Sequence, residues 1–111
     1  MDAAPGFALQ VTEGGEGPVV RLVGDIDLAS SGEVRECLHG LAGQRVTLDC
    51  SGVTFMDSTA IGVLVASEQR NEQDGGVIVL RGVQPAQMRI FEIAGLSESL
   101  NFDGTGSASS A

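Results

Sequence analysis

The 111-residue sequence contains no lysine, and its six arginines and one histidine face fifteen acidic residues, for a formal net charge of −9. A nucleic-acid-binding protein needs a stripe of basic side chains to neutralise phosphates, whereas these arginines occur singly along the chain. The absence of lysine also excludes a lysine Schiff base, phosphate clamp or general base. We therefore expect neither a nucleic-acid partner nor lysine-dependent catalysis.

Histidine, cysteine and long apolar runs are also scarce. His39 has no evident nucleophile to activate, and Cys37 and Cys50 are too few for a disulfide framework and too far apart for a metal knuckle. The longest apolar run, residues 60–66, is far shorter than the about 20 residues that cross a bilayer. The first residues lack the features of a signal peptide. The sequence predicts a cytoplasmic, non-enzymatic protein with free thiols, no cofactor, no metal and no membrane contact.

The order of apolar patterns predicts one α/β domain over residues 1–103, followed by a disordered tail at 104–111. The expected order is β-β-α-β-α-β-α-β, with strands at 7–11, 19–23, 45–50, 77–80 and 96–102 and helices at 30–43, 58–71 and 85–95. Strand–helix–strand repeats imply parallel pairing with right-handed crossovers. We expect a mixed, mostly parallel sheet with an antiparallel first strand at its edge and helices packed mainly on one side.

Three details of the helices follow from local pattern. Ser30 and Glu33 have the spacing of a capping box at the start of the first helix. The second helix has an apolar first half and a polar second half, which predicts burial at its start and exposure at its end. The third helix is expected to begin at Pro85 and to bury Met88, Ile90, Phe91, Ile93 and Ala94.

Residues 49–64 are the least generic part of the chain. We expect Gly52 to end a strand, so that Phe55 and Met56 lie in a loop before the second helix. The sequence Asp57-Ser58-Thr59 is typical of a helix N-cap, and Ser58 would lie at the positive end of the helix dipole, where a phosphate is tolerated. Capping and reversible phosphorylation are compatible interpretations of these residues.

Large apolar residues in a loop with a polar rim predict a partner-binding patch. The predicted patch consists of Asp25, Ile26, Asp27, Phe55, Met56, Asp57, Ser58 and Thr59. We expect its apolar members to lie outside the core. Asp25 and Asp27 lack a third convergent ligand, so we predict neither a metal site nor an acid–base pair there.

The same region resembles the signature of the STAS domain, most closely that of the bacterial anti-sigma factor antagonists, over about residues 7–102. The matching residues are Gly24-Asp25-Ile26-Asp27 and Asp49-x-Ser51-Gly52-Val53-x-Phe55-Met56-Asp57-Ser58-Thr59-x-x-Gly62-Val63-Leu64. The resemblance implies that Ser58 is phosphorylated by an anti-sigma factor that is itself a serine kinase. It further implies that the unphosphorylated protein binds this kinase and frees the sigma factor, that phosphorylation breaks the complex, and that a metal-dependent serine phosphatase resets it. Ala60 and Ile61 replace the family's common Gly-Leu pair, which bears on the efficiency of phosphorylation more than on its site.

Three alternatives remain open at this point. The same fold could serve another complex, as a signalling scaffold or a subunit of a lipid transport system. A receiver-like phospho-aspartate domain would use Asp25 and Asp27 as its acidic pair, but the required lysine is missing. A nucleotide-binding role would need a glycine-rich phosphate loop, which the sequence lacks.

Overall fold

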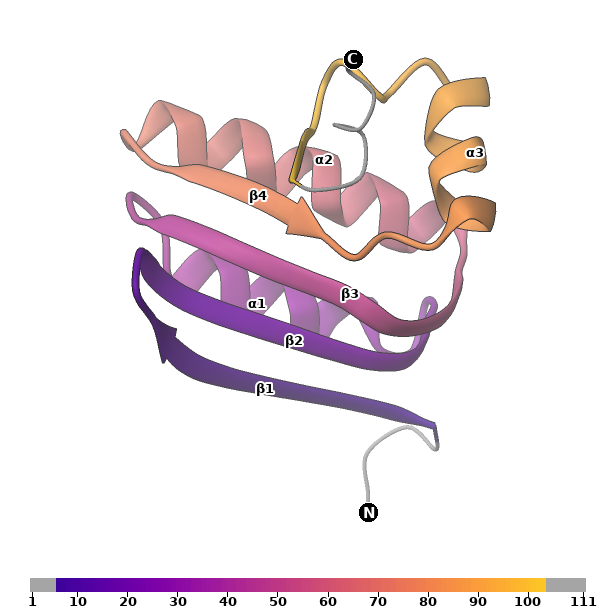
Figure 1. The fold of residues 1–111 in the computed structure, drawn as a ribbon, viewed down its shortest axis with the longest axis horizontal. Helices are drawn as coiled ribbons and strands as arrows, with labels where there is room; N and C mark the ends of the chain where they lie inside the picture. The colour runs from indigo at the N-terminus through magenta and orange to yellow at the C-terminus, as the bar shows by residue number, and fades with distance from the viewer. Residues whose placement is uncertain (1–5, 104–111) are drawn as a thin grey trace.

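The computed structural model describes residues 6–103, and the predicted tail at 104–111 lies outside the described residues. The elements are β1 (Phe7–Gly14), β2 (Gly17–Ile26), α1 (Ser31–Gly40), β3 (Arg45–Met56), α2 (Ser58–Gln73), β4 (Val77–Arg81), α3 (Pro85–Ile93) and β5 (Asn101–Asp103). The strands form one sheet in the order β1-β2-β3-β4-β5 (Figure 1). β1 pairs antiparallel with β2 and the other pairs are parallel. The predicted α/β fold with an antiparallel edge strand is confirmed.

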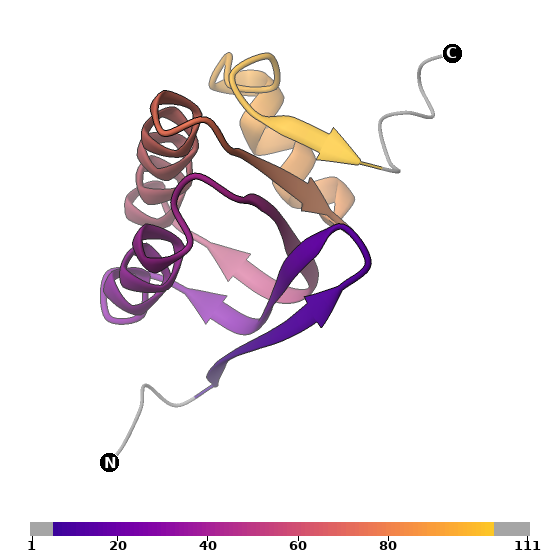
Figure 2. The same cartoon turned by 90° about the vertical axis from the view of Figure 1, so that its left-hand side faces the viewer.

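The first two helices form a layer on one face of the sheet. α1 and α2 lie side by side there, while α3 lies at the end of the sheet where β3 and β4 finish (Figures 1 and 2). This arrangement differs from a receiver-like fold, whose parallel strands are ordered 2-1-3-4-5 with helices on both faces. The strand order therefore excludes the receiver-like alternative.

The core lies between the sheet and this helix layer. It is built from alternate residues of the strands, including Val20 and Leu22 of β2 and Val46 and Leu48 of β3, which are fully buried. The ring of Phe91 in α3 is also fully buried, and its centroid lies 5.6 Å from that of Phe102 in β5. α3 and β5 are thereby tied to the same core.

The first four strands are longer than the sequence pattern predicts, whereas the last strand, predicted at 96–102, is shorter and comprises only Asn101–Asp103. β1 extends through Gly14, so the hairpin turns tightly at residues 15 and 16. The prediction that Gly52 ends the third strand is wrong, because β3 continues to Met56 and stays paired with β2 as far as Ile26. The β2–β3 register shifts next to Gly52, where a Cβ atom would lie 3.0 Å from Val23 Cγ2. Gly52 therefore permits a close approach of two strands at an irregularity of the register.

The capping box expected at Ser30 does not form. Ser30 Oγ donates to the backbone oxygen of Asp25 (3.0 Å) and accepts from the amide of Asp27 (3.0 Å). The side chain makes no hydrogen bond to the first turn of α1. Ser30 instead fastens the start of α1 to the end of β2.

The buried faces of the other helices also differ from the expected ones. In α3, Phe91 is buried and Met88 partly so, whereas Ile90, Ile93 and the C-cap residue Ala94 are exposed. The buried line of α2 continues to its last turn through Glu68 and Asn71, so the prediction that this helix emerges at its end is wrong. Polar side chains with internal hydrogen-bond partners can face a sheet, and hydropathy alone does not reveal them.

Both cysteines are free thiols, as expected. Burial, with a smaller effect of the neighbouring Asp49 carboxylate, raises the pKa of Cys50 to about 12. Cys50 is therefore protonated at neutral pH and is a packing residue rather than a nucleophile.

Candidate partner-binding site

The candidate site lies at the edge of the sheet where the carboxyl ends of β2 and β3 meet. Asp25 pairs with Phe55 and Ile26 with Met56 in the parallel ladder, and the amide of Asp57 donates to the oxygen of Ile26 (3.2 Å). Two segments about thirty residues apart are thereby brought side by side. Functional groups of parallel α/β sheets tend to collect at such an edge.

Asp57 is the N-cap of α2, as predicted. Its backbone is extended (φ −96°, ψ −179°), and its Oδ1 accepts a hydrogen bond from the amide of Ala60 (2.9 Å). This geometry satisfies one of the amides that a helix start leaves without an internal partner. Ser58 is the first residue of α2, and both Ser58 and Thr59 are exposed. The Ser58 hydroxyl is thus accessible to a partner at the positive end of the helix.

The other two aspartates of the predicted patch shape the neighbouring turn. Asp25 Oδ1 accepts from Thr54 Oγ1 (2.6 Å), which joins the end of β2 to β3. Asp27 Oδ1 accepts from the amides of Ala29 (3.0 Å) and Ser30 (3.3 Å) and so organises the turn into α1. Within residues 6–103, no three histidine, cysteine, aspartate or glutamate side chains gather in a way that could hold a metal ion.

The buried positions correct part of the predicted patch. Ile26 is 1% and Met56 3% exposed, and both side chains belong to the core cluster. They are register partners, so their side chains lie on the same face of the sheet, and that face is the one covered by helices. The expectation that Met56 lies in a loop outside the core is wrong. Ile26 and Met56 support the site from beneath.

The exposed apolar residues at this edge are Phe55, which is 52% exposed, and Leu28, which is 76% exposed. The prediction included Phe55 but missed Leu28. Leu28 lies in the turn between β2 and α1, before the helix begins at Ser31. Because Leu28 falls outside the helical period of α1, the sequence could have indicated that its side chain is not part of the buried helix face.

Asp49 and Ser51, which open the signature, belong to the sheet. Asp49 Oδ1 accepts from the amide (3.0 Å) and from Oγ (2.8 Å) of Ser51, and its Oδ2 lies 3.8 Å from Arg81 Nη2. Burial acts to raise the pKa of Asp49, but the Ser51 hydrogen bonds together with Arg81 and Arg21 outweigh it and leave that pKa lowered. The hydroxyl of Ser51 is therefore held by a charged neighbour, in contrast to the open Ser58.

The sequence matches a known family and curated proteins over most of its length. The family described as "Mlab, STAS domain" matches residues 9–101. The anti-sigma-B factor antagonist of Bacillus subtilis (strain 168) is 33% identical over 84 residues, which cover 74% of this chain and 77% of that protein. The chain belongs to the STAS domain family of anti-sigma factor antagonists.

Solved structures share the fold of this STAS domain. An anti-sigma factor antagonist from Mycobacterium paratuberculosis gives a TM-score of 0.79 at 20% identity, covering 96% of this chain and 94% of that chain. The Bacillus cell fate determinant SpoIIAA in its phosphorylated form gives 0.66 at 21% identity, covering 91% and 96%. Among residues 6–103 of the STAS domain, no helix combines the length and apolarity needed to cross a membrane.

Proposed function

We propose that this STAS domain is an anti-sigma factor antagonist that switches partners in the cytoplasm, without enzymatic activity of its own. Unphosphorylated, it binds an anti-sigma factor that is a serine kinase. Phosphorylated on Ser58, it releases that kinase, and a serine phosphatase restores the binding form. The names of its relatives support the role of antagonist.

The observation that carries the proposal is the position of Ser58. Its side chain is exposed at the first residue of α2, directly after the capping residue Asp57. The nearby Ser51 is a poorer acceptor because its hydroxyl already donates to Asp49. SpoIIAA, a protein of the same fold, has a phosphorylated form. These features support Ser58 as the phosphoacceptor.

The docking surface that we propose surrounds this serine. Its apolar contacts are Phe55 and Leu28, and its polar contacts are Asp25, Asp27, Asp57, Ser58 and Thr59. Exposed apolar side chains framed by polar ones are typical of protein interfaces, and aromatic residues often contribute most of the binding energy.

Phosphorylation of Ser58 would break the complex through charge. A phosphoryl group adds about −1.5 to −2 charges at neutral pH. The helix start of α2 tolerates that charge, so the fold survives. A partner surface that fits a neutral hydroxyl must desolvate the new charge beside Asp57, and each 1.4 kcal/mol lost weakens binding about tenfold.

The test uses two variants of Ser58 and a neighbouring control. Ser58→Ala should resist phosphorylation and bind the kinase permanently, whereas Ser58→Asp should bind weakly, both with native circular dichroism. Thr59→Ala, at an exposed hydroxyl one residue later, should still be phosphorylated. Binding is measured by calorimetry with the candidate kinase, and the phosphate is located by mass spectrometry.

Two outcomes would contradict the assignment. Phosphate found on Thr59 or Ser51 and never on Ser58 would refute the site. Equal binding by Ser58→Ala and Ser58→Asp would favour the alternative role, in which the domain is a permanent subunit of a signalling scaffold or of a lipid transport system.

A further inference from the structure

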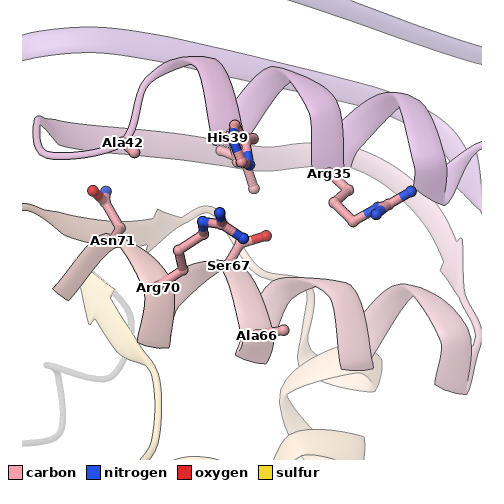
Figure 3. Close-up of a pocket in the computed structure, with 8 residues that line it drawn as sticks. Arg35, His39, Ala42, Ala66, Ser67, Arg70 and Asn71 are labelled. Carbon is pink, nitrogen blue, oxygen red and sulfur yellow. The ribbon is translucent and has the colours of Figure 1, made fainter. Parts of the chain in front are cut away.

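Basic side chains gather at one place on this acidic protein. Of the six arginines and one histidine of the chain, Arg35, His39 and Arg70 line a single hollow of about 90 Å³ between α1 and α2. Figure 3 shows Arg70 and Ser67 extending from α2 toward α1, and Arg35 running along α1 at the rim of the hollow, with its guanidinium directed away from Arg70. The crossover that places the two helices side by side thus brings an arginine from each helix to one hollow.

Among residues 6–103, the two arginines of this hollow lack the carboxylate partners that Arg45 and Arg81 have. Arg45 Nε lies 3.3 Å from Glu16 Oε1, and Arg81 contacts Asp49. Within residues 6–103, neither Arg35 nor Arg70 has a carboxylate within ion-pair distance. An arginine without a carboxylate partner keeps its donors available for a bound anion.

The hollow has a fixed frame and a small size. Its inner wall is apolar and includes Leu38 and two small residues, Ala42 and Ala66, which leave the gap open. At one end Asn71 accepts from the amide of Gly43 and donates to the oxygen of Gln44 (3.1 Å), which fixes α2 against the turn after α1. A preset gap of this volume suits a compact group rather than a segment of a partner protein.

We propose that this α1–α2 hollow binds a phosphate group, either as inorganic phosphate or as a small phosphate monoester. Arginine side chains donate paired hydrogen bonds to phosphate oxygens, and the Ser67 hydroxyl adds a further donor. Glu36 lines an adjoining hollow with Arg35 and His39, so its carboxylate repels a phosphate bound nearby. The site is separate from Ser58, since Arg70 follows twelve residues later in α2, about 18 Å along the helix axis.

The test is a titration of the full chain with inorganic phosphate, followed by amide NMR shifts at constant ionic strength, with glycerol 3-phosphate as a second probe. We expect saturable shifts at residues 35–42 and 66–71. Arg35→Gln and Arg70→Gln should each raise the Kd about tenfold, which corresponds to about 1.4 kcal/mol. Glu36→Gln should lower the Kd.

Controls separate a site from a general charge effect. Arg89→Gln makes the same change of charge at an exposed position of α3 and should leave the Kd unchanged. Ser58→Ala should also leave it unchanged, so this proposal and the proposed switch fail independently. Equal Kd values for the two probes identify free phosphate as sufficient, and tighter binding of the ester identifies a monoester. Absence of saturable shifts with both probes, or equal weakening by Arg89→Gln and Arg70→Gln, would overturn the proposal.

Discussion

Glu68 is the one charged side chain that is buried among the described residues, with 2% of its surface exposed. Its Oε1 accepts from the amide of Ile78 (2.8 Å) and its Oε2 from Asn101 Nδ2 (2.9 Å), which also donates to the oxygen of Ile78 (3.2 Å). β5 begins to pair with β4 at Val79, so it does not reach Ile78. The side chains of Glu68 and Asn101 therefore take the place of the missing strand.

Glu68→Ala would remove both acceptors at once. The buried donor left without a partner is the amide of Ile78, because Asn101 is exposed and keeps its hydrogen bond to the Ile78 oxygen. Such a loss costs about 1 to 3 kcal/mol, so Glu68→Ala should lower the free energy of unfolding by about that amount. That is a large fraction of the about 5 to 15 kcal/mol that stabilises a typical domain. Glu72→Ala is the matched control, since Glu72 is exposed one turn later in the same helix and should change stability by less than about 0.5 kcal/mol.

Urea denaturation of the two variants measures the difference, with an unchanged slope as the check that the unfolding reaction is the same. A cost for Glu68→Ala no greater than that for Glu72→Ala would refute the reasoning. It would mean that water replaces the carboxylate without loss, and that the bridge between α2, β4 and β5 does not stabilise the fold.

The same residue predicts a dependence on pH. Burial is the main cause that raises the pKa of Glu68 above its ordinary 4.5, and the Glu72 carboxylate adds to it against the hydrogen bonds from Ile78 and Asn101. The folded state then holds the proton more tightly than the unfolded state, so the stability that depends on protonation of Glu68 is fully present below pH 4.5 and is lost as the pH rises through the raised value. The stability of Glu68→Gln relative to the unmodified protein should therefore increase with pH across that window, and a constant difference would contradict this.

Two further predictions concern the edge of the sheet. Met56→Ala should lower the free energy of unfolding by about 2 to 5 kcal/mol, because it opens a cavity under the site. A loss below about 1 kcal/mol in urea denaturation would mean that the Met56 side chain is not part of the core. Phe55 is half-exposed and is the register partner of Asp25. Phe55→Ala should lower the free energy of unfolding by less than about 1 kcal/mol, yet weaken kinase binding by tenfold or more when measured by calorimetry. An unchanged affinity would show that Phe55 is not part of the docking surface.

Local pattern was sufficient for the order of elements and for the cap of α2. Asp57 precedes an apolar helix, and the first turn of any helix needs an acceptor for its amides, so its role could be predicted from neighbours in sequence. Pro85 and Gly95 likewise bound α3 as expected, with Gly95 in the left-handed region at φ 76°. These features depend on contacts within a few residues.

Features set by pairing between distant segments could not be predicted in this way. Whether Phe55 and Met56 belong to a loop or to a strand depends on Asp25 and Ile26 lying beside them, and that register resumes only after a second irregularity, between Gly24 and Asp25. The same holds for the hollow between α1 and α2, whose arginines come from two helices that the sequence gives no reason to align residue by residue.

The arrangement of α2 supports the proposal that a charge added at Ser58 acts on a partner rather than on the fold. The helix turns its buried line, Ala60, Leu64, Glu68 and Asn71, toward the sheet, and Ser58 and Thr59 lie exposed before that line begins. The Asp57 carboxylate already satisfies the amide of Ala60, so a phosphate on Ser58 need not replace any internal hydrogen bond. A phosphate there would therefore meet water in the free protein and the partner's surface in the complex, and only the complex would lose free energy.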